Sequence, residues 1–100
     1  MSDSPFAYIS AIAYHLPSTE LTNEQLSEAF PEWSVDKIMN KVGISARRVV
    51  AENEFSSDLA VAAARQLFIE DNLDPAGIDY LILCTQSPDY FLPTTACLVH

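Results

Sequence analysis

The feature that most constrains the fold is an uninterrupted apolar run late in the chain. Five consecutive apolar residues, Tyr80–Cys84, lie between Gly77 and Pro88. A run this short, without alternation of polar and apolar residues, is typical of a strand buried on both faces of a layered α/β sheet. Such a strand needs hydrogen-bonding neighbours on both edges and helices on both faces. We expect the preceding residues to supply only part of those surroundings.

Composition excludes several classes of protein. Hydrophobic residues make up 49% of the 100 residues, which is typical of a globular chain. No apolar stretch approaches the roughly 20 residues of a membrane helix, and no signal-peptide pattern opens the chain. The net charge of −9 argues against a nucleic-acid partner, because phosphate binding relies on clustered Lys and Arg. The basic doublet Arg47–Arg48 is expected to be a solvated pair at a strand edge. Two cysteines suggest the reducing cytoplasm.

Start and stop signals predict three helices before the apolar run. Their expected bounds are Thr22 to about Phe30, Val35–Val42, and Ser56 or Ser57 to near Asn72. Thr22 and Gln25 fit a capping box for the first helix, and Ser34 is expected to cap the second. Gly43 and Asn72 stand where left-handed C-terminal caps belong, and Asp74 can open one further turn.

Two more strands are predicted, one at Phe6–Tyr14 and a short strand or ribbon at Ile44–Val50. Another helix is expected to follow Thr94. Two or three strands are fewer than the roughly five or six of a usual sheet. We therefore expect residues 1–100 to be the N-terminal portion of a longer domain, without an internal boundary.

An ordered set of segments carries a family resemblance. The segments are Tyr14–Pro17, Leu21–Glu24, Trp33, Lys41–Arg48, Ser57–Ala64 and Ile78–Cys97. Together they resemble the N-terminus of the β-ketoacyl-[acyl-carrier-protein] synthase III family, in the thiolase-like superfamily. No single motif is decisive, but the ordered set spans nearly the whole chain. It implies part of the N-terminal half of an α/β thiolase-like layered fold, with a mixed sheet covered by helices, in a protein that is usually a homodimer.

The resemblance also implies an acyltransferase of fatty acid biosynthesis as the full-length parent. In the family, a cysteine at a helix N-terminus takes an acyl group from acyl-CoA, and malonyl carrier protein then condenses with loss of carbon dioxide. That cysteine and its histidine and asparagine partners lie beyond His100 in the family pattern. We therefore expect no catalytic residue, metal or cofactor here, and no activity from the segment alone. Two alternatives stay open: another thiolase-like acyl-CoA condensing enzyme, or a small non-catalytic α/β binding module.

Three residues match substrate-binding positions of the family. Trp33 and Lys41 correspond to the aromatic and basic residues that line the CoA channel, although Trp33 lies farther from Gly43 than the family spacing. Leu92 corresponds to a position whose side chain reaches the acyl pocket of the partner subunit. The structural alternatives are a hydrophobic staple for Trp33, a charge that complements the helix dipole for Lys41, and an ordinary interface residue for Leu92. Tyr90 and Phe91 next to it form an aromatic cluster that fits a buried interface.

The remaining nucleophile and ligand candidates favour structural roles. Cys97 lies near a helix start with His100 three residues on, so a thiolate–imidazole pair is geometrically allowed. A small apolar filler is the favoured reading of Cys97, and Cys84 is expected in the core. His15 has no second ligand at a metal-binding spacing.

Overall fold

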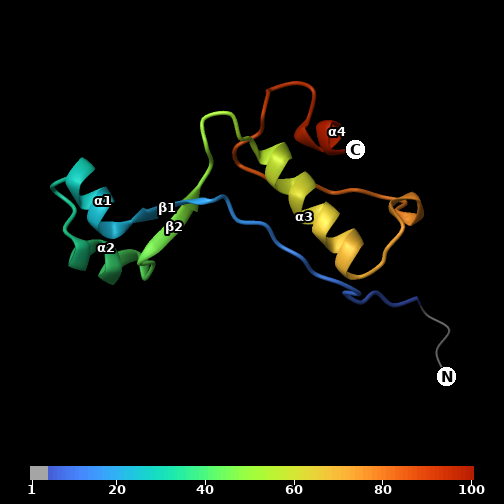
Figure 1. Cartoon of the computed structure of the whole chain (residues 1–100), viewed down its shortest axis with the longest axis horizontal. Coiled ribbons are helices and arrows are strands. Elements are labelled where there is room, and N and C mark those ends of the chain that lie inside the picture. The colour runs from blue at the N-terminus through green and yellow to red at the C-terminus, as the bar shows by residue number, and fades with distance from the viewer. Residues whose placement is uncertain (1–4) are drawn as a thin grey trace. The chain divides into compact units, whose positions relative to one another are not determined.

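A computed structural model describes residues 5–100, and these residues form two compact units (Figure 1). One unit is the continuous stretch Leu16–Phe55. The other, which we call the α3 unit, combines the described residues up to His15 with Ser56–His100. Within residues 5–100, no helix is both long enough and apolar enough to cross a membrane.

The Leu16–Phe55 unit is a two-stranded ribbon that carries a helical hairpin. Its elements are β1 (Thr19–Thr22), α1 (Asn23–Ala29), α2 (Val35–Val42) and β2 (Ala46–Val49). β1 and β2 pair antiparallel, with Thr19 opposite Val49 and Thr22 opposite Ala46. The ribbon therefore joins the start of α1 to the segment that follows α2.

The predicted helix caps of this unit are confirmed. At the start of α1, the Gln25 amide donates to Thr22 Oγ1 at 3.3 Å, and the Thr22 amide donates to Gln25 Oε1 at 2.8 Å. Ser34 Oγ accepts from the Lys37 amide at 3.2 Å at the start of α2. Gly43 ends α2 with φ 73°, a left-handed conformation that glycine adopts without a Cβ penalty.

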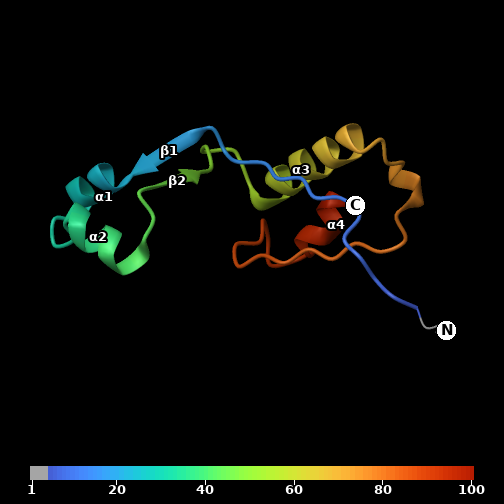
Figure 2. The same ribbon diagram turned by 90° about the horizontal axis from the view of Figure 1, so that it is seen from below.

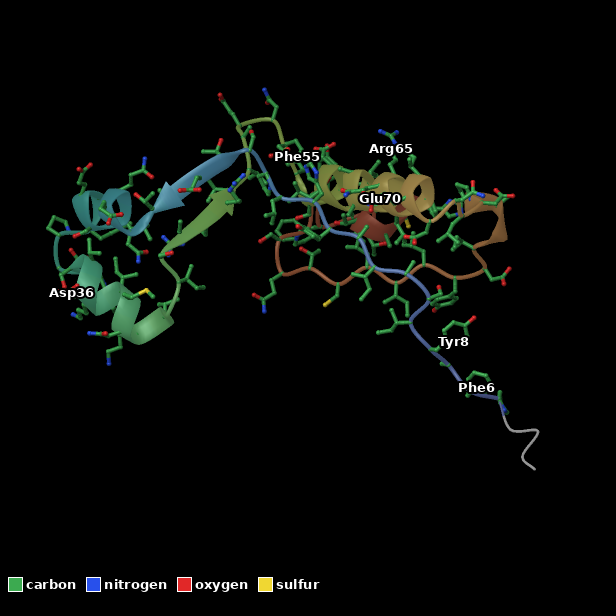
Figure 3. All side chains as sticks on the ribbon, turned by 60° about the horizontal axis from the view of Figure 1, so that its bottom comes forward. Phe6, Tyr8, Asp36, Phe55, Arg65 and Glu70 are labelled. Atoms are coloured by element: carbon green, nitrogen blue, oxygen red, sulfur yellow. The ribbon has the colours of Figure 1, made fainter. Side chains whose placement is uncertain are left out.

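The α3 unit contains a long helix and two short ones. They are α3 (Ser56–Glu70), a 3-10 turn η1 (Pro75–Gly77) and α4 (Thr95–Val99). Asn72 has φ 50° after α3, and the Asp74 carboxylate accepts from the Ala76 amide at 2.9 Å at η1, as predicted. α4 packs beside α3 (Figure 2). Arg65 extends from α3 into solvent (Figure 3).

Two strand predictions are wrong for this chain. Neither Phe6–Tyr14 nor Tyr80–Cys84 belongs to a β-ladder, and β1 with β2 forms the only sheet within residues 5–100. A small antiparallel ribbon therefore stands in place of the expected mixed sheet, while the α/β class is confirmed. A strand is defined by backbone bonds to a neighbour, and no described segment provides one to either run. Phe6 and Tyr8 lie along the N-terminal run (Figure 3), with ring centroids 6.2 Å apart.

Burial is sparse throughout the described residues. Ile38 on α2 is their only buried hydrophobic core residue. Cys84 and Cys97 are both exposed, so the prediction of buried positions is wrong for this chain. The Tyr90 side chain is exposed within this unit, and its burial in an interface stays a prediction. Extended apolar segments such as Tyr80–Cys84 place few side chains against a neighbour, and their hydrophobic surface stays open to water.

Candidate functional site

An apolar hollow of about 390 Å³ lies between α1 and α2. Its lining residues are Leu26, Phe30, Trp33, Ile38 and Val42. The two helices meet through a short turn in which the Trp33 amide donates to the Phe30 carbonyl oxygen at 2.9 Å. This turn fixes the backbone of Trp33 at the hinge of the hairpin, so its indole forms part of the wall of the hollow.

The indole of Trp33 carries a cation on its face. Lys37 Nζ lies 4.5 Å from the centroid of a Trp33 ring, within the range of a cation–π interaction. The same ammonium donates to the Glu32 carbonyl oxygen at 3.5 Å. Trp33 remains 40% exposed, so the pair is accessible to solvent. Sequence reasoning missed Lys37, although its position in the first turn after the Ser34 cap was a usable signal.

Lys41 occupies the last turn of α2, and its side chain is exposed. Residues four apart share a helix face, so Lys37 and Lys41 lie along one side of α2. Lys41 does not line the hollow, and the structure therefore brings Trp33 together with Lys37 rather than with Lys41. A positive charge at this end of a helix also complements the helix dipole.

The hydrophobic-staple alternative for Trp33 has structural support. Trp33 immediately precedes the cap residue Ser34, and Ile38 is the fourth residue of α2. Those are the two positions that a hydrophobic staple joins, and both side chains line the same hollow. Trp33 thus has a packing role whatever else it contacts.

A buried polar clamp closes the base of the hairpin. Asn23 is 3% exposed, and its side-chain amide donates to the Ile44 carbonyl oxygen at 2.9 Å. Its carbonyl oxygen accepts from Arg47 Nη2 at 2.8 Å, and its backbone amide donates to the Ser45 carbonyl oxygen at 3.2 Å. Arg47 is therefore half-buried and hydrogen-bonded rather than fully solvated, whereas Arg48 on the same strand is exposed as predicted. Because the clamp ties the first residue of α1 to the segment after α2, it holds the hollow in shape.

Leu92 lies on a loop of the α3 unit that is anchored at both ends. The Asp89 carboxylate accepts from the Ser57 amide at 3.0 Å and from the Ser57 hydroxyl. The Asp89 amide donates to Thr95 Oγ1 at 3.2 Å, and Thr95 is 3% exposed. Leu92 itself is 82% exposed, and the Leu92–Pro93 peptide is cis. The loop thus presents Leu92 to solvent from fixed ends.

The cysteine and metal candidates form no centre in the described part of the chain. The Cys97 sulfur lies 3.3 Å from Thr94 Oγ1, and no hydrogen bond joins Cys97 to His100. Among residues 5–100, no three His, Cys, Asp or Glu side chains gather at a metal-binding arrangement. The chemistry that these residues offer is binding, through the apolar hollow and through the exposed lysines of α2 near Trp33.

Comparison with solved structures places this arrangement in the thiolase-like class of α/β folds. A crystal structure of 3-oxoacyl-(acyl-carrier-protein) synthase III superposes with a TM-score of 0.83 at 47% identity, over 95% of this chain and 28% of that chain. The Thermus thermophilus β-ketoacyl synthase III gives a TM-score of 0.83 at 36% identity, covering 93% of this chain and 29% of that one. A crystal structure of Xanthomonas campestris OleA gives a TM-score of 0.78 at 30% identity, covering 91% of this chain and 29% of that one.

Curated sequences lead to the same group of proteins. The chain is 40% identical over 96 residues to the β-ketoacyl-[acyl-carrier-protein] synthase III of Solibacter usitatus, covering 96% of this chain and 29% of the relative. The synthase III of Porphyromonas gingivalis is 42% identical over 94 residues, and the match covers 93% of this chain and 28% of that relative. No protein-family profile matches the chain. The resemblance seen in the sequence is confirmed, and the chain spans less than a third of the length of these relatives.

Proposed function

We propose that this chain is the N-terminal segment of a β-ketoacyl-[acyl-carrier-protein] synthase III. The parent enzyme transfers an acyl group from acyl-CoA to a cysteine and then condenses it with malonyl carrier protein. The observation that carries the proposal is the 40% identity over 96% of the chain to a protein of that name. The nucleophilic cysteine and its partners belong to the part of the parent outside these residues, and the parent acts as a cytoplasmic homodimer.

Within the parent, Trp33, Lys41 and Leu92 serve substrate binding. The Trp33 ring and the ammonium groups of Lys37 and Lys41 suit a ligand that combines an aromatic base with phosphates. Such a ligand stacks on an indole and places its negative charges beside the cations. Coenzyme A has both parts, so this side of α2 contributes to the CoA channel. Leu92 forms part of an acyl pocket, where its bulk limits acyl-chain length.

Steady-state kinetics of the full-length parent test this proposal. With malonyl carrier protein as acceptor, Lys41→Gln should raise KM for acyl-CoA about fivefold and leave kcat unchanged, since an exposed ion pair contributes up to about 1 kcal/mol. Arg65→Gln is the matched control, because it removes another exposed cation, from α3. Equal KM values for the two variants would refute the role of Lys41. A parent that transfers no acyl group from any acyl-CoA would refute the function.

A second candidate keeps the fold and changes the reaction. The likeness to OleA, at 30% identity and a TM-score of 0.78, supports another thiolase-like acyl-CoA condensing enzyme. Replacing malonyl carrier protein by a second acyl-CoA in the same assay separates the two candidates. Condensation with carrier protein alone favours the synthase III function, and condensation with the second acyl-CoA alone favours the alternative.

A further inference from the structure

Asp89 links α3 to α4 through hydrogen bonds, and the loop at residues 90–94 lies between Asp89 and α4. Its carboxylate accepts two hydrogen bonds from Ser57 in the first turn of α3, and its backbone amide donates to Thr95 at the start of α4. The neighbouring Ser87 carbonyl oxygen accepts from Ser56 Oγ at 2.5 Å. These bonds fix both ends of the segment that contains Phe91 and Leu92.

Apolar packing does not hold the middle of this loop. Phe91 is 100% exposed and Leu92 is 82% exposed, so neither side chain is pinned by burial against the unit. The loop instead borders a hollow of about 230 Å³ whose lining includes Tyr90 and Thr95. Within the α3 unit, the polar bonds at the ends of the loop are therefore the contacts that hold Leu92 in position. Charge-assisted bonds to a carboxylate are the strongest of these.

We propose that Asp89 is a positioning residue, which sets the acyl-chain selectivity of the parent enzyme by holding the loop that presents Leu92. This inference rests on the proposed function, in which Leu92 limits acyl-chain length. Asp89 contacts no substrate. Its effect passes through the Ser57 and Thr95 bonds to the placement of the Leu92 side chain.

The test uses the full-length parent and the ratio of kcat/KM for octanoyl-CoA to that for acetyl-CoA. A merely structural role lowers the amount of active enzyme, which cancels in this ratio. Asp89→Asn keeps the size of the side chain but removes its negative charge, so the charge-assisted bonds to Ser57 become weaker neutral bonds, with the amide NH₂ donating to Ser57 Oγ. Asp79→Asn is the matched control, since Asp79 is exposed and lies in the same unit. Ser57→Ala removes only the hydroxyl that donates to Asp89, and it replaces Asp89→Asn as the test variant if that variant fails to fold.

Leu92→Ala should raise the octanoyl-to-acetyl ratio at least about tenfold, the lower end of the discrimination that one methylene group provides in a hydrophobic pocket. Asp89→Asn should raise it about threefold, a partial effect because the loop retains its other anchors, and the double variant should match Leu92→Ala. A ratio for Asp89→Asn equal to that of Asp79→Asn would overturn the inference while leaving the proposed function intact. An unchanged ratio for Leu92→Ala would overturn both the inference and the proposed role of Leu92. Absence of any acyl transfer by the wild-type parent would refute the function itself.

Discussion

Replacement of Asn23 by alanine should be among the most damaging single changes in the Leu16–Phe55 unit. The substitution removes the bond to the Ile44 carbonyl oxygen and leaves the Arg47 guanidinium without its shortest contact. A neutral bond contributes about 1 kcal/mol, and a bond to a charged group contributes about 1.5–3 kcal/mol. Because the guanidinium keeps longer contacts, 3.4 Å each, to the Leu21 and Ile44 carbonyl oxygens, we expect a net loss of about 2–3 kcal/mol.

Urea unfolding of the full-length parent measures this loss. At a slope of about 2–3 kcal/mol/M, the midpoint of Asn23→Ala should fall by about 1 M with an unchanged m-value. Asn40→Ala is the matched control: Asn40 is exposed within α2, where alanine is the better helix former. Asn23→Asp retains an acceptor for Arg47 but loses the donor to Ile44, so its midpoint should fall between wild type and Asn23→Ala. Equal midpoints for Asn23→Ala and Asn40→Ala would refute the role of the clamp.

Two further predictions concern the backbone and the sparse core. Gly43→Ala in the parent should cost about 1–2 kcal/mol in urea unfolding, because φ 73° is strained for an L-residue even though open space surrounds the added Cβ. Gly77→Ala, also in open space but without a positive φ, should be neutral or slightly stabilising, and equal effects would contradict this reasoning. Among the described residues, Ile38 is the only buried hydrophobic one. An isolated 1–100 polypeptide should therefore unfold without a sharp urea transition and should bind a hydrophobic dye. A cooperative transition with a normal m-value would contradict this expectation.

The helix caps could be predicted because their chemistry is local. The Thr22–Gln25 box, the Ser34 cap and the left-handed Gly43 and Asn72 each depend on residues within one helical turn. A short pattern contains nearly all of the interactions that decide such an element.

The strands could not be predicted in this way, because a strand is decided by a distant partner. The run Tyr80–Cys84 has the composition of a buried strand, yet no described segment pairs with it. β1 (Thr19–Thr22) went unpredicted, because the only expectation for these residues was a helix cap at Thr22. What makes it a strand is its pairing with β2, more than twenty positions away in the sequence.

The candidate site shows the same contrast between local interactions, which a sequence pattern reveals, and long-range interactions, which it does not. Trp33 and Lys41 were identified by resemblance, and the structure adds Lys37 through a contact four residues from Trp33. The bonds between Asp89 and Ser57 and between Asn23 and Arg47 join residues 32 and 24 positions apart. No spacing rule connects such pairs, so only the fold reveals them.

The division into two units has a consequence for synthesis on the ribosome. The Leu16–Phe55 unit is one unbroken stretch, so all of its partners have emerged soon after Phe55 leaves the exit tunnel. The segment before it belongs to the α3 unit and must wait for Ser56–His100. At about 5–20 residues per second, that wait lasts on the order of seconds. During it the segment before Leu16 is separated from the rest of its unit, and the apolar side chains of Phe6 and Ile9, which stay largely exposed even in the complete α3 unit, are open to water from the start of synthesis.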